Sequence, residues 1–215
     1  MVLGIDNRTE NWKTAYEFAP FFRDAEARKR LVGRLDETDY AEADDIHFEL
    51  FWKGTRDYLH AESNGEKGKS RERLLMYCRD MLPELRDRVV SSKRFQELKD
   101  DNYALPTPES DSKLLSNLSN TEIDIVIETP RSLFIGEAKQ EESFEARSGH
   151  VLVHQLIRQY VMAKALLKAM GCSRTVVPFV VGDPVDQLKR QQVKFMISQR
   201  WMNERNVLSW EDVKI

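Results

Sequence analysis

The chain has few of the features that mark secreted, disulfide-stabilised or membrane-spanning proteins. Its 215 residues include only two cysteines, Cys78 and Cys172, too few for a disulfide framework or a four-cysteine metal cluster. No apolar run approaches the ~20 residues that span a bilayer, and residues 1–13 lack the basic and apolar regions of a secretory signal. We therefore expect ordinary thiols and an intracellular, cytoplasmic protein without a membrane partner; association with the nucleoid stays open.

Excess positive charge is also missing. The chain carries 33 basic and 36 acidic side chains, a formal net charge of −3, whereas nucleic-acid-binding proteins are usually basic overall or on one face. The basic groupings at 67–73 and 189–200 are more typical of solvated helix surfaces than of a phosphate track. The four histidines form no metal-binding pair by spacing, and no phosphate-cradling glycine loop or G-x-S-x-G motif is present.

The segment Thr121–Gln140 (TEIDIVIETPRSLFIGEAKQ) predicts a β-hairpin. Its first half alternates three isoleucines with polar side chains, the pattern of a strand that is buried on one face. Pro130 suits the second position of a β-turn, and Thr129 and Ser132 would close a two-residue loop around it. Because 129 and 132 sum to 261, every pair of facing residues in this hairpin should also sum to 261.

This register places two acidic side chains directly across the ladder. Asp124 lies opposite Glu137, and Glu122 lies opposite Lys139. Two facing carboxylates have Cβ atoms ~5 Å apart and repel each other. A divalent cation between them would turn the repulsion into coordination, because Mg²⁺ takes one or two carboxylates plus waters and phosphate oxygens. Lys139, on the side of Glu137, adds positive charge suited to phosphodiester hydrolysis; alternatively it forms only an exposed ion pair with Glu122.

Asp124 followed by Glu137-Ala138-Lys139 resembles the motif of the PD-(D/E)xK nuclease superfamily, the restriction-endonuclease-like enzymes. Ile123 stands where the name of the family has proline, a departure that many members share. The resemblance implies a Mg²⁺- or Mn²⁺-dependent nuclease that cleaves phosphodiester bonds, most readily in DNA. It also implies that Asp124, Glu137 and the carbonyl of Ala138 hold the metal, and that Lys139 positions the attacking water or stabilises developing charge.

Two further groups of site residues follow from the resemblance. Members of the superfamily often add a glutamate from a helix that precedes the hairpin; Glu72 is the first choice and Glu49 its competitor. A helix after the Glu-x-Lys strand often offers glutamine to the substrate, which makes Gln155, Arg158 and Gln159 the candidates for nucleic-acid binding. The stricter Gln-x-x-x-Tyr spacing is not met, and an ordinary polar stripe on an amphipathic helix is the alternative.

Hydrophobic periodicity and breaking residues predict the remaining elements. Gly171 should end a long helix, Asp183 with Pro184 should begin another that reaches about Met202, and Pro178 should mark a sheet edge or bulge. Residues 84–120 are ambiguous, and the tail after residue 206 adds a short strand or turn. The expected helices cover 11–35 with a break at Pro20, 44–62, 71–82 and 151–170, and the expected further strand covers 174–181.

This order of elements predicts an α/β protein. We expect a three-layer αβα core of the restriction-endonuclease-like type with a mixed central sheet at residues 66–215, and an added N-terminal helical region at 1–65 packed on it. Two other functions stay open beside the nuclease. The acidic net charge favours a non-catalytic subunit of a nucleic-acid-processing or defence assembly, and an unrelated α/β protein could carry the motif by chance. DNA is the expected partner; a protein partner or a homodimer is left open.

Overall fold

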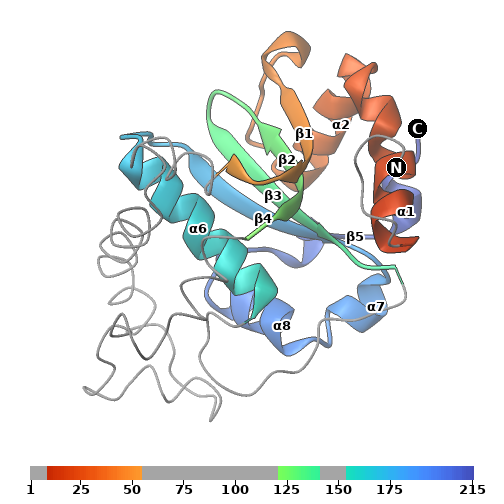
Figure 1. Ribbon diagram of the computed structural model, residues 1–215, viewed down its shortest axis with the longest axis vertical. Helices are drawn as coiled ribbons and strands as arrows, with labels where there is room; N and C mark the ends of the chain where they lie inside the picture. The colour runs from red at the N-terminus through yellow and green to blue at the C-terminus, as the bar shows by residue number, and fades with distance from the viewer. Residues whose placement is uncertain (1–8, 55–120, 141–153) are drawn as a thin grey trace. The chain divides into compact units, whose positions relative to one another are not determined.

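The computed structural model describes residues 9–54, 121–140 and 154–215 (Figure 1). Their strands form a mixed five-stranded sheet in the order β1-β2-β3-β4-β5, so the predicted α/β class is confirmed. The chain divides into two compact units. The first contains the described residues 9–52, 123–140 and 174–215, and the second contains 53–54, 121–122 and 154–173.

Strands β2 (Ile123–Glu128) and β3 (Ser132–Ala138) form the predicted antiparallel hairpin. The turn is closed by Thr129, whose amide donates to the carbonyl of Ser132 at 2.9 Å. Facing Cα pairs run from Ile125 with Gly136 to Glu128 with Leu133, so every pair sums to 261. The predicted register is therefore confirmed along the paired part of the ladder.

Strand β1 (His47–Trp52) pairs antiparallel with β2 and corrects one prediction. A helix over residues 44–62 is wrong for this stretch. Phe48 and Leu50 alternate onto the core side of the sheet, where both are partly buried against the hydrophobic cluster. The same sequence also allows a helical pattern, but pairing of its backbone groups with β2 favours the strand, in which side chains alternate with a period of two.

Strand β4 (Thr175–Val181) runs parallel to β3 along its whole length, which confirms the strand predicted at 174–181. Backbone groups of successive residues point alternately to the two neighbours. Val181 accepts a hydrogen bond from the β3 side, and Gly182 donates one to β5 (Val207–Leu208). By this alternation, the backbone nitrogen of Pro178 points toward β5. In the described chain β5 pairs only with Val180 and Val181. Pro178 therefore faces no paired strand on that side, and its missing N–H group costs no ladder hydrogen bond, as expected for a sheet edge.

The N-terminal helices confirm the predicted break at Pro20. α1 (Thr9–Phe18) is followed by the 3-10 turn η1 (Ala19–Phe22), and then by α2 (Ala25–Leu35). Proline is tolerated in the first turn of a helix because its missing N–H would have no partner there. Asp24 caps α2, because its carboxylate accepts a hydrogen bond from the amide of Ala27 at 2.8 Å.

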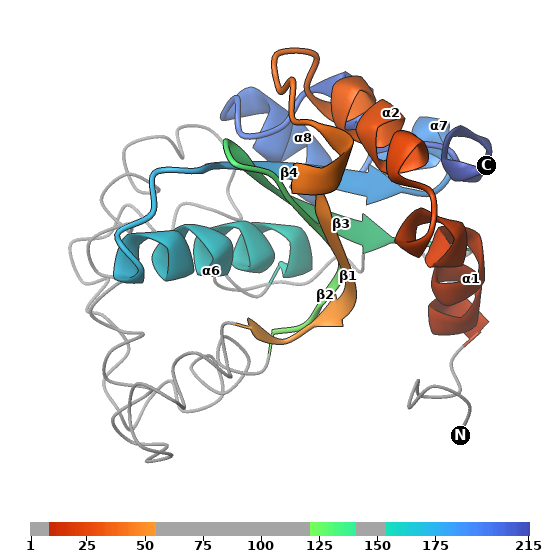
Figure 2. The ribbon, with the colours of Figure 1, turned by 90° about the horizontal axis from the view of Figure 1, so that it is seen from above.

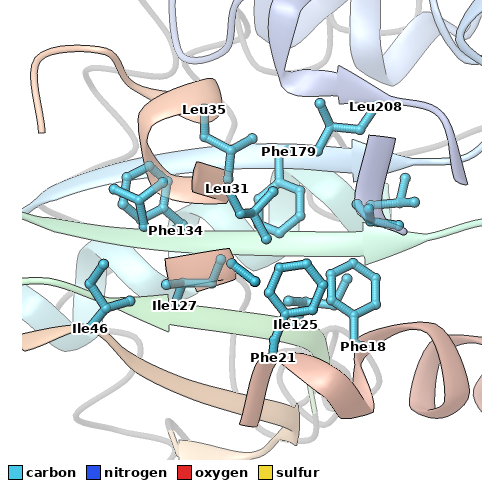
Figure 3. Close-up of a cluster of buried hydrophobic side chains, with 14 of the residues drawn as sticks. Phe18, Phe21, Leu31, Leu35, Ile46, Ile125, Ile127, Phe134, Phe179 and Leu208 are labelled. Carbon is cyan, nitrogen blue, oxygen red and sulfur yellow. The ribbon is translucent and has the colours of Figure 1, made fainter. Parts of the chain in front are cut away.

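One face of the sheet packs against these helices. Figure 2 shows α2 on one side of β3 and β4, and Figure 3 shows the side chains that fill the space between them. Apolar side chains that alternate along the strands meet aromatic rings from α1 and η1 and leucines from α2, which removes them from water. The fully buried members include Phe18, Leu35, Ile125, Ile127, Phe134 and Phe179.

The chain after β4 contains two short helices instead of the single predicted one. Asp183 caps α7 (Pro184–Gln187) as expected, with its carboxylate accepting from two backbone amides. The amides of Lys189 and Arg190 then bond three residues back, which tightens the turn and ends the helix. α8 (Gln191–Ser198) follows. The tail forms β5 between the 3-10 turns η5 (Glu204–Asn206) and η6 (Trp210–Val213), which confirms the predicted short strand or turn.

The second unit contains α6 (Gln155–Ala169), which lies within the predicted helix at 151–170. The predicted stop at Gly171 is confirmed: this residue has φ +64°, and the next amide, of Cys172, bonds back to the carbonyl of Leu167 at 2.8 Å. Several predictions lie outside the described residues: the helix at 71–82, the ambiguous stretch at 84–120, the boundary between residues 65 and 66, Glu72 and Cys78.

Candidate active site

The predicted acidic residues lie where the β2–β3 ladder ends. The last backbone pair joins Ile125 and Gly136. Beyond it, the amide of Ala138 donates to the Oδ2 atom of Asp124 at 2.9 Å, so a side chain replaces the backbone acceptor of β2. The Asp124 side chain is half-buried. This hydrogen bond fixes the carboxylate beside the Glu-Ala-Lys segment.

Glu137 and Lys139 form an ion pair in the interior. The Nζ atom of Lys139 lies 2.6 Å from Oε1 of Glu137, and the side chains are 10% and 1% exposed. Residues two apart on a strand share a face, and the confirmed register gives them the face of Asp124. The structure thus gathers the three predicted catalytic residues at one end of one sheet face.

The opposite face of β3 explains why small residues alternate with these charges. A Cβ atom on Gly136 would lie 2.3 Å from the ring of Phe179 on the neighbouring strand, so a larger residue does not fit. Ala138 is fully buried in the hydrophobic cluster. Packing on this side fixes which residues of β3 point away from the cluster, and so it directs Glu137 and Lys139 to the other face.

The backbone of Lys139 is held on both sides. Its amide donates to the carbonyl of Val181 at 2.8 Å, and its carbonyl accepts from the indole Nε1 of Trp210 at 3.2 Å. A Cβ atom on Gly182 would lie 3.0 Å from that same carbonyl oxygen. Trp210 could not be identified from the sequence, because no local pattern links residues 71 positions apart.

The oxygen atoms at this end of the sheet are suitable ligands for a hard divalent cation. Two carboxylates, from Asp124 and Glu137, and the backbone carbonyl of Ala138 are the oxygen ligands that Mg²⁺ and Mn²⁺ prefer. Within the described ranges there is no cluster of three or more His, Cys, Asp or Glu side chains that could hold a metal. Of the predicted set, only Asp124 and Glu137 contribute such side chains here, because Glu72 lies outside the described residues. Glu137 would share its carboxylate between the cation and the Lys139 ammonium group.

The structure places one of the two candidate accessory acids. Glu49 is exposed and lies on β1, not on a helix, opposite Val126. Directly opposed residues share a sheet face, and Val126 shares its face with Asp124 two residues earlier. Glu49 therefore belongs to the face that carries the predicted site. Glu72, the first choice, lies outside the described residues.

The candidates for nucleic-acid binding belong to the second unit. Arg158 donates from Nε to the hydroxyl of Thr121 at 3.1 Å, and the buried Gln159 donates to the carbonyl of Glu122 at 3.0 Å. Gln155 is half-buried at the start of α6. These bonds give Arg158 and Gln159 a role in holding the chain just before β2; their role with a nucleic acid stays a prediction.

The sequence also allows Lys139 to form only an exposed ion pair with Glu122. The carboxylate of Glu122 lies 2.6 Å from Nζ of Lys53, and the ammonium group of Lys139 pairs with Glu137. Lys139 is also buried, whereas an exposed cross-strand pair would leave it in water. The observed contacts therefore differ from those of a simple surface pair.

No family model, curated protein or solved structure matches this chain. Among the residues that the structure describes, none of the helices combines the length and the apolar character needed to cross a membrane.

Proposed function

We propose that the protein is a metal-dependent nuclease of the restriction-endonuclease-like type that hydrolyses phosphodiester bonds in DNA, with Mg²⁺ or Mn²⁺ as cofactor. One observation carries the proposal. The buried ion pair of Glu137 and Lys139 flanks a residue, Ala138, whose amide binds the carboxylate of Asp124. The three charged groups of the sequence motif thus lie on one sheet face, near the end of a strand.

Stability alone is a poor reason to keep such a pair. Removing two charges from water costs several kcal/mol per ion, and a well-packed apolar pair of similar volume is often as stable or more stable. Glu137 and Lys139 are both nearly inaccessible, so their desolvation is close to complete. A chemical role for the two charges accounts for their presence. The mixed sheet with the acids on a β-hairpin supports the same proposal.

The roles of the three side chains follow from their positions. A bound divalent cation would polarise the phosphate and lower the pKa of a coordinated water. Asp124 and Glu137 present carboxylate oxygens from neighbouring strands, and the Ala138 amide holds Asp124 in that orientation. The ammonium group of Lys139, oriented by Glu137, supplies positive charge where charge develops on the phosphate.

Asp124→Asn tests the assignment with little disturbance of the fold, because an amide oxygen can still accept the bond from Ala138. We expect metal-dependent cleavage of plasmid DNA to fall by at least ~10²-fold, the scale of a lost catalytic electrostatic interaction. Glu128→Gln is the matched control. It removes an acid from the same face of β2 at the other end of the strand, where the partner is Arg174. Cleavage that survives in Asp124→Asn, or falls equally in the control, would contradict the assignment.

A non-catalytic nuclease-fold subunit of a larger nucleic-acid-processing assembly is the second candidate. The net charge of −3 favours it, because such a subunit needs no basic surface of its own. Calorimetric titration with Mn²⁺ separates the two. Saturable binding that Asp124→Asn weakens supports the nuclease, whereas the absence of binding together with the absence of cleavage supports the subunit.

A further inference from the structure

We infer that Trp210 is a positioning residue for the candidate active site, acting through the backbone carbonyl of Lys139. The inference rests on the proposed function, because Trp210 can affect the reaction in this way only if Lys139 takes part in it. Trp210 belongs to η6 in the tail of the chain and is partly buried against the hydrophobic cluster. Its indole Nε1 lies 3.2 Å from the Lys139 oxygen, within the normal range for a hydrogen bond.

The bond acts at the point where regular strand structure stops. β3 ends at Ala138, and the amide of Lys139 makes one more bond, to Val181 of β4. The following carbonyl has the indole N–H as its donor. The two bonds together fix the peptide plane on either side of the Lys139 Cα, and this sets the direction in which the side chain leaves toward Glu137.

Trp210 is itself held by several contacts within the first unit. The ammonium group of Lys13, from α1, lies 4.4 Å from the centre of the indole ring, a cation–π contact. The turn that carries Trp210 has a reciprocal capping box between Ser209 and Asp212. Asp212 also pairs with Arg34 of α2 at 2.8 Å. Groups on two N-terminal helices therefore brace the donor that reaches the Lys139 carbonyl.

The close approach of Gly182 to the Lys139 carbonyl indicates that this carbonyl group has a closely fixed position. A Cβ atom at that position would lie 3.0 Å from the Lys139 oxygen and 3.3 Å from the side chain of Gln187. The oxygen thus lies close to Gly182, the residue after β4, and to the indole nitrogen. Without the indole donor, the peptide can turn about the end of β3, and the ammonium group turns with it.

Trp210→Phe removes the N–H group and keeps an aromatic ring for packing. We expect kcat for metal-dependent DNA cleavage, per folded molecule, to fall about tenfold while KM stays within about twofold, because small displacements of an aligned group mainly affect the reaction step. Trp12→Phe is the matched control: the same substitution on α1, at a side chain that is 39% exposed. Equal kcat values in Trp210→Phe, Trp12→Phe and the unaltered protein would overturn the inference and leave the proposed function standing.

A second readout does not depend on activity. Lys139 is buried, so an acylating reagent should label it far more slowly than the exposed Lys189, as measured by peptide mass spectrometry. We expect Trp210→Phe to raise labelling of Lys139 severalfold relative to Lys189, and Trp12→Phe to leave the ratio unchanged. If the unaltered protein cleaves no DNA but the ratio still rises, the proposed function fails while the positioning contact stands. An unchanged ratio overturns the contact.

Replacement of Trp210 by benzothienylalanine guards against a folding defect. This analogue has the shape of tryptophan but carries sulfur in place of the indole N–H. A purely structural role for the ring predicts normal kcat and normal labelling of Lys139. A positioning role through the hydrogen bond predicts the same loss of kcat and the same rise in labelling as Trp210→Phe.

Discussion

Gly136 on β3 and Phe179 on β4 face each other across the parallel ladder, and the Phe179 ring occupies the space of a side chain on residue 136. A Cβ atom there would lie 2.3 to 2.7 Å from three ring carbons. Phe179 is fully buried within the hydrophobic cluster and has little room to move. The glycine is therefore part of the core packing that turns the next residue, Glu137, to the opposite face.

Gly136→Ala should destabilise the protein. Overpacking a close-packed core costs ~1–3 kcal/mol, because side chains leave their preferred rotamers or the backbone shifts. Gly33→Ala is the matched control. It lies within α2 with nothing inside 4 Å of the added Cβ, and should stabilise by ~0.5–1 kcal/mol. Urea unfolding of both variants measures the difference, and equal effects would contradict the packing described here.

The hairpin could be predicted from sequence because local signals determine it. Thr129, Pro130 and Ser132 specify a tight turn, alternating isoleucines specify the buried face, and together they set the register that β2 and β3 adopt. β1 could not be predicted in the same way. The letters HFELFW suit an amphipathic helix as well as a strand, and the choice depends on pairing with β2, more than 70 residues later.

The candidate site was also only partly predictable. The alternation of residues places Asp124, Glu137 and Lys139 on one face, and the structure agrees. The hydrogen bond from the Ala138 amide to Asp124 depends on where the ladder stops, which no local pattern gives. The contact of Trp210 with Lys139 depends on the path of the tail past β4, so it becomes visible only in the folded chain.

Two helices end in the same backbone motif with different residues at the left-handed position. Gly171, at φ +64°, follows the last turn of α6, and Arg200, at φ +58°, follows the last turn of α8. In each case the following amide bonds back to a carbonyl five residues earlier: Cys172 to Leu167, and Trp201 to Met196. Left-handed backbone costs a residue with a side chain ~1–2 kcal/mol, whereas glycine adopts it freely.

Arg200→Gly should therefore stabilise the protein, and Gly171→Ala should destabilise it, each by ~1 kcal/mol. Arg200 is exposed, so its replacement removes little packing. Thermal unfolding followed by circular dichroism would show the melting temperature rising in the first variant and falling in the second. A shift of the same sign in both variants would contradict the assignment of these two helix ends.

The pH dependence of stability should include a contribution from Asp212. Burial raises the pKa of this carboxyl group, but hydrogen bonds from Ser209 and the ion pair with Arg34 outweigh it and lower the pKa below its ordinary value of 3.8. The unfolded chain therefore takes up this proton at a higher pH than the folded chain. The stabilisation is complete above the unfolded pKa and is lost as the pH falls through the folded pKa.

Asp212→Asn should reduce the dependence of the unfolding free energy on pH in this acid range. The control is Glu211→Gln, an acid in the same turn that pairs with Lys214 and makes neither capping bond. Denaturant unfolding from about pH 5 down to about pH 2 measures the slope, because the difference in bound protons between the two states sets it. An unchanged slope in Asp212→Asn would show that Asp212 contributes nothing to acid unfolding.

The buried pair of Glu137 and Lys139 should give strongly non-additive effects on stability. Lys139→Met removes the ammonium group that pairs with the buried Glu137 carboxylate, and breaking a buried pair in this way costs ~3–5 kcal/mol. Glu137→Leu should cost a similar amount, because it removes the carboxylate that pairs with the Lys139 ammonium group. The double variant removes both charges, and we expect its stability to lie within ~1 kcal/mol of the unaltered protein or above it.

Urea unfolding of the two single variants and the double variant completes a double-mutant cycle, which isolates the pair from its surroundings. The double variant should be folded, because apolar packing replaces the ion pair. It should lack metal-dependent DNA cleavage and should bind Mn²⁺ more weakly, because the two charged groups are gone. Single variants that each lose less than ~1 kcal/mol, the range of exposed ion pairs, would show that water reaches the pair. A stable double variant that still cleaves DNA would remove the catalytic role of both residues.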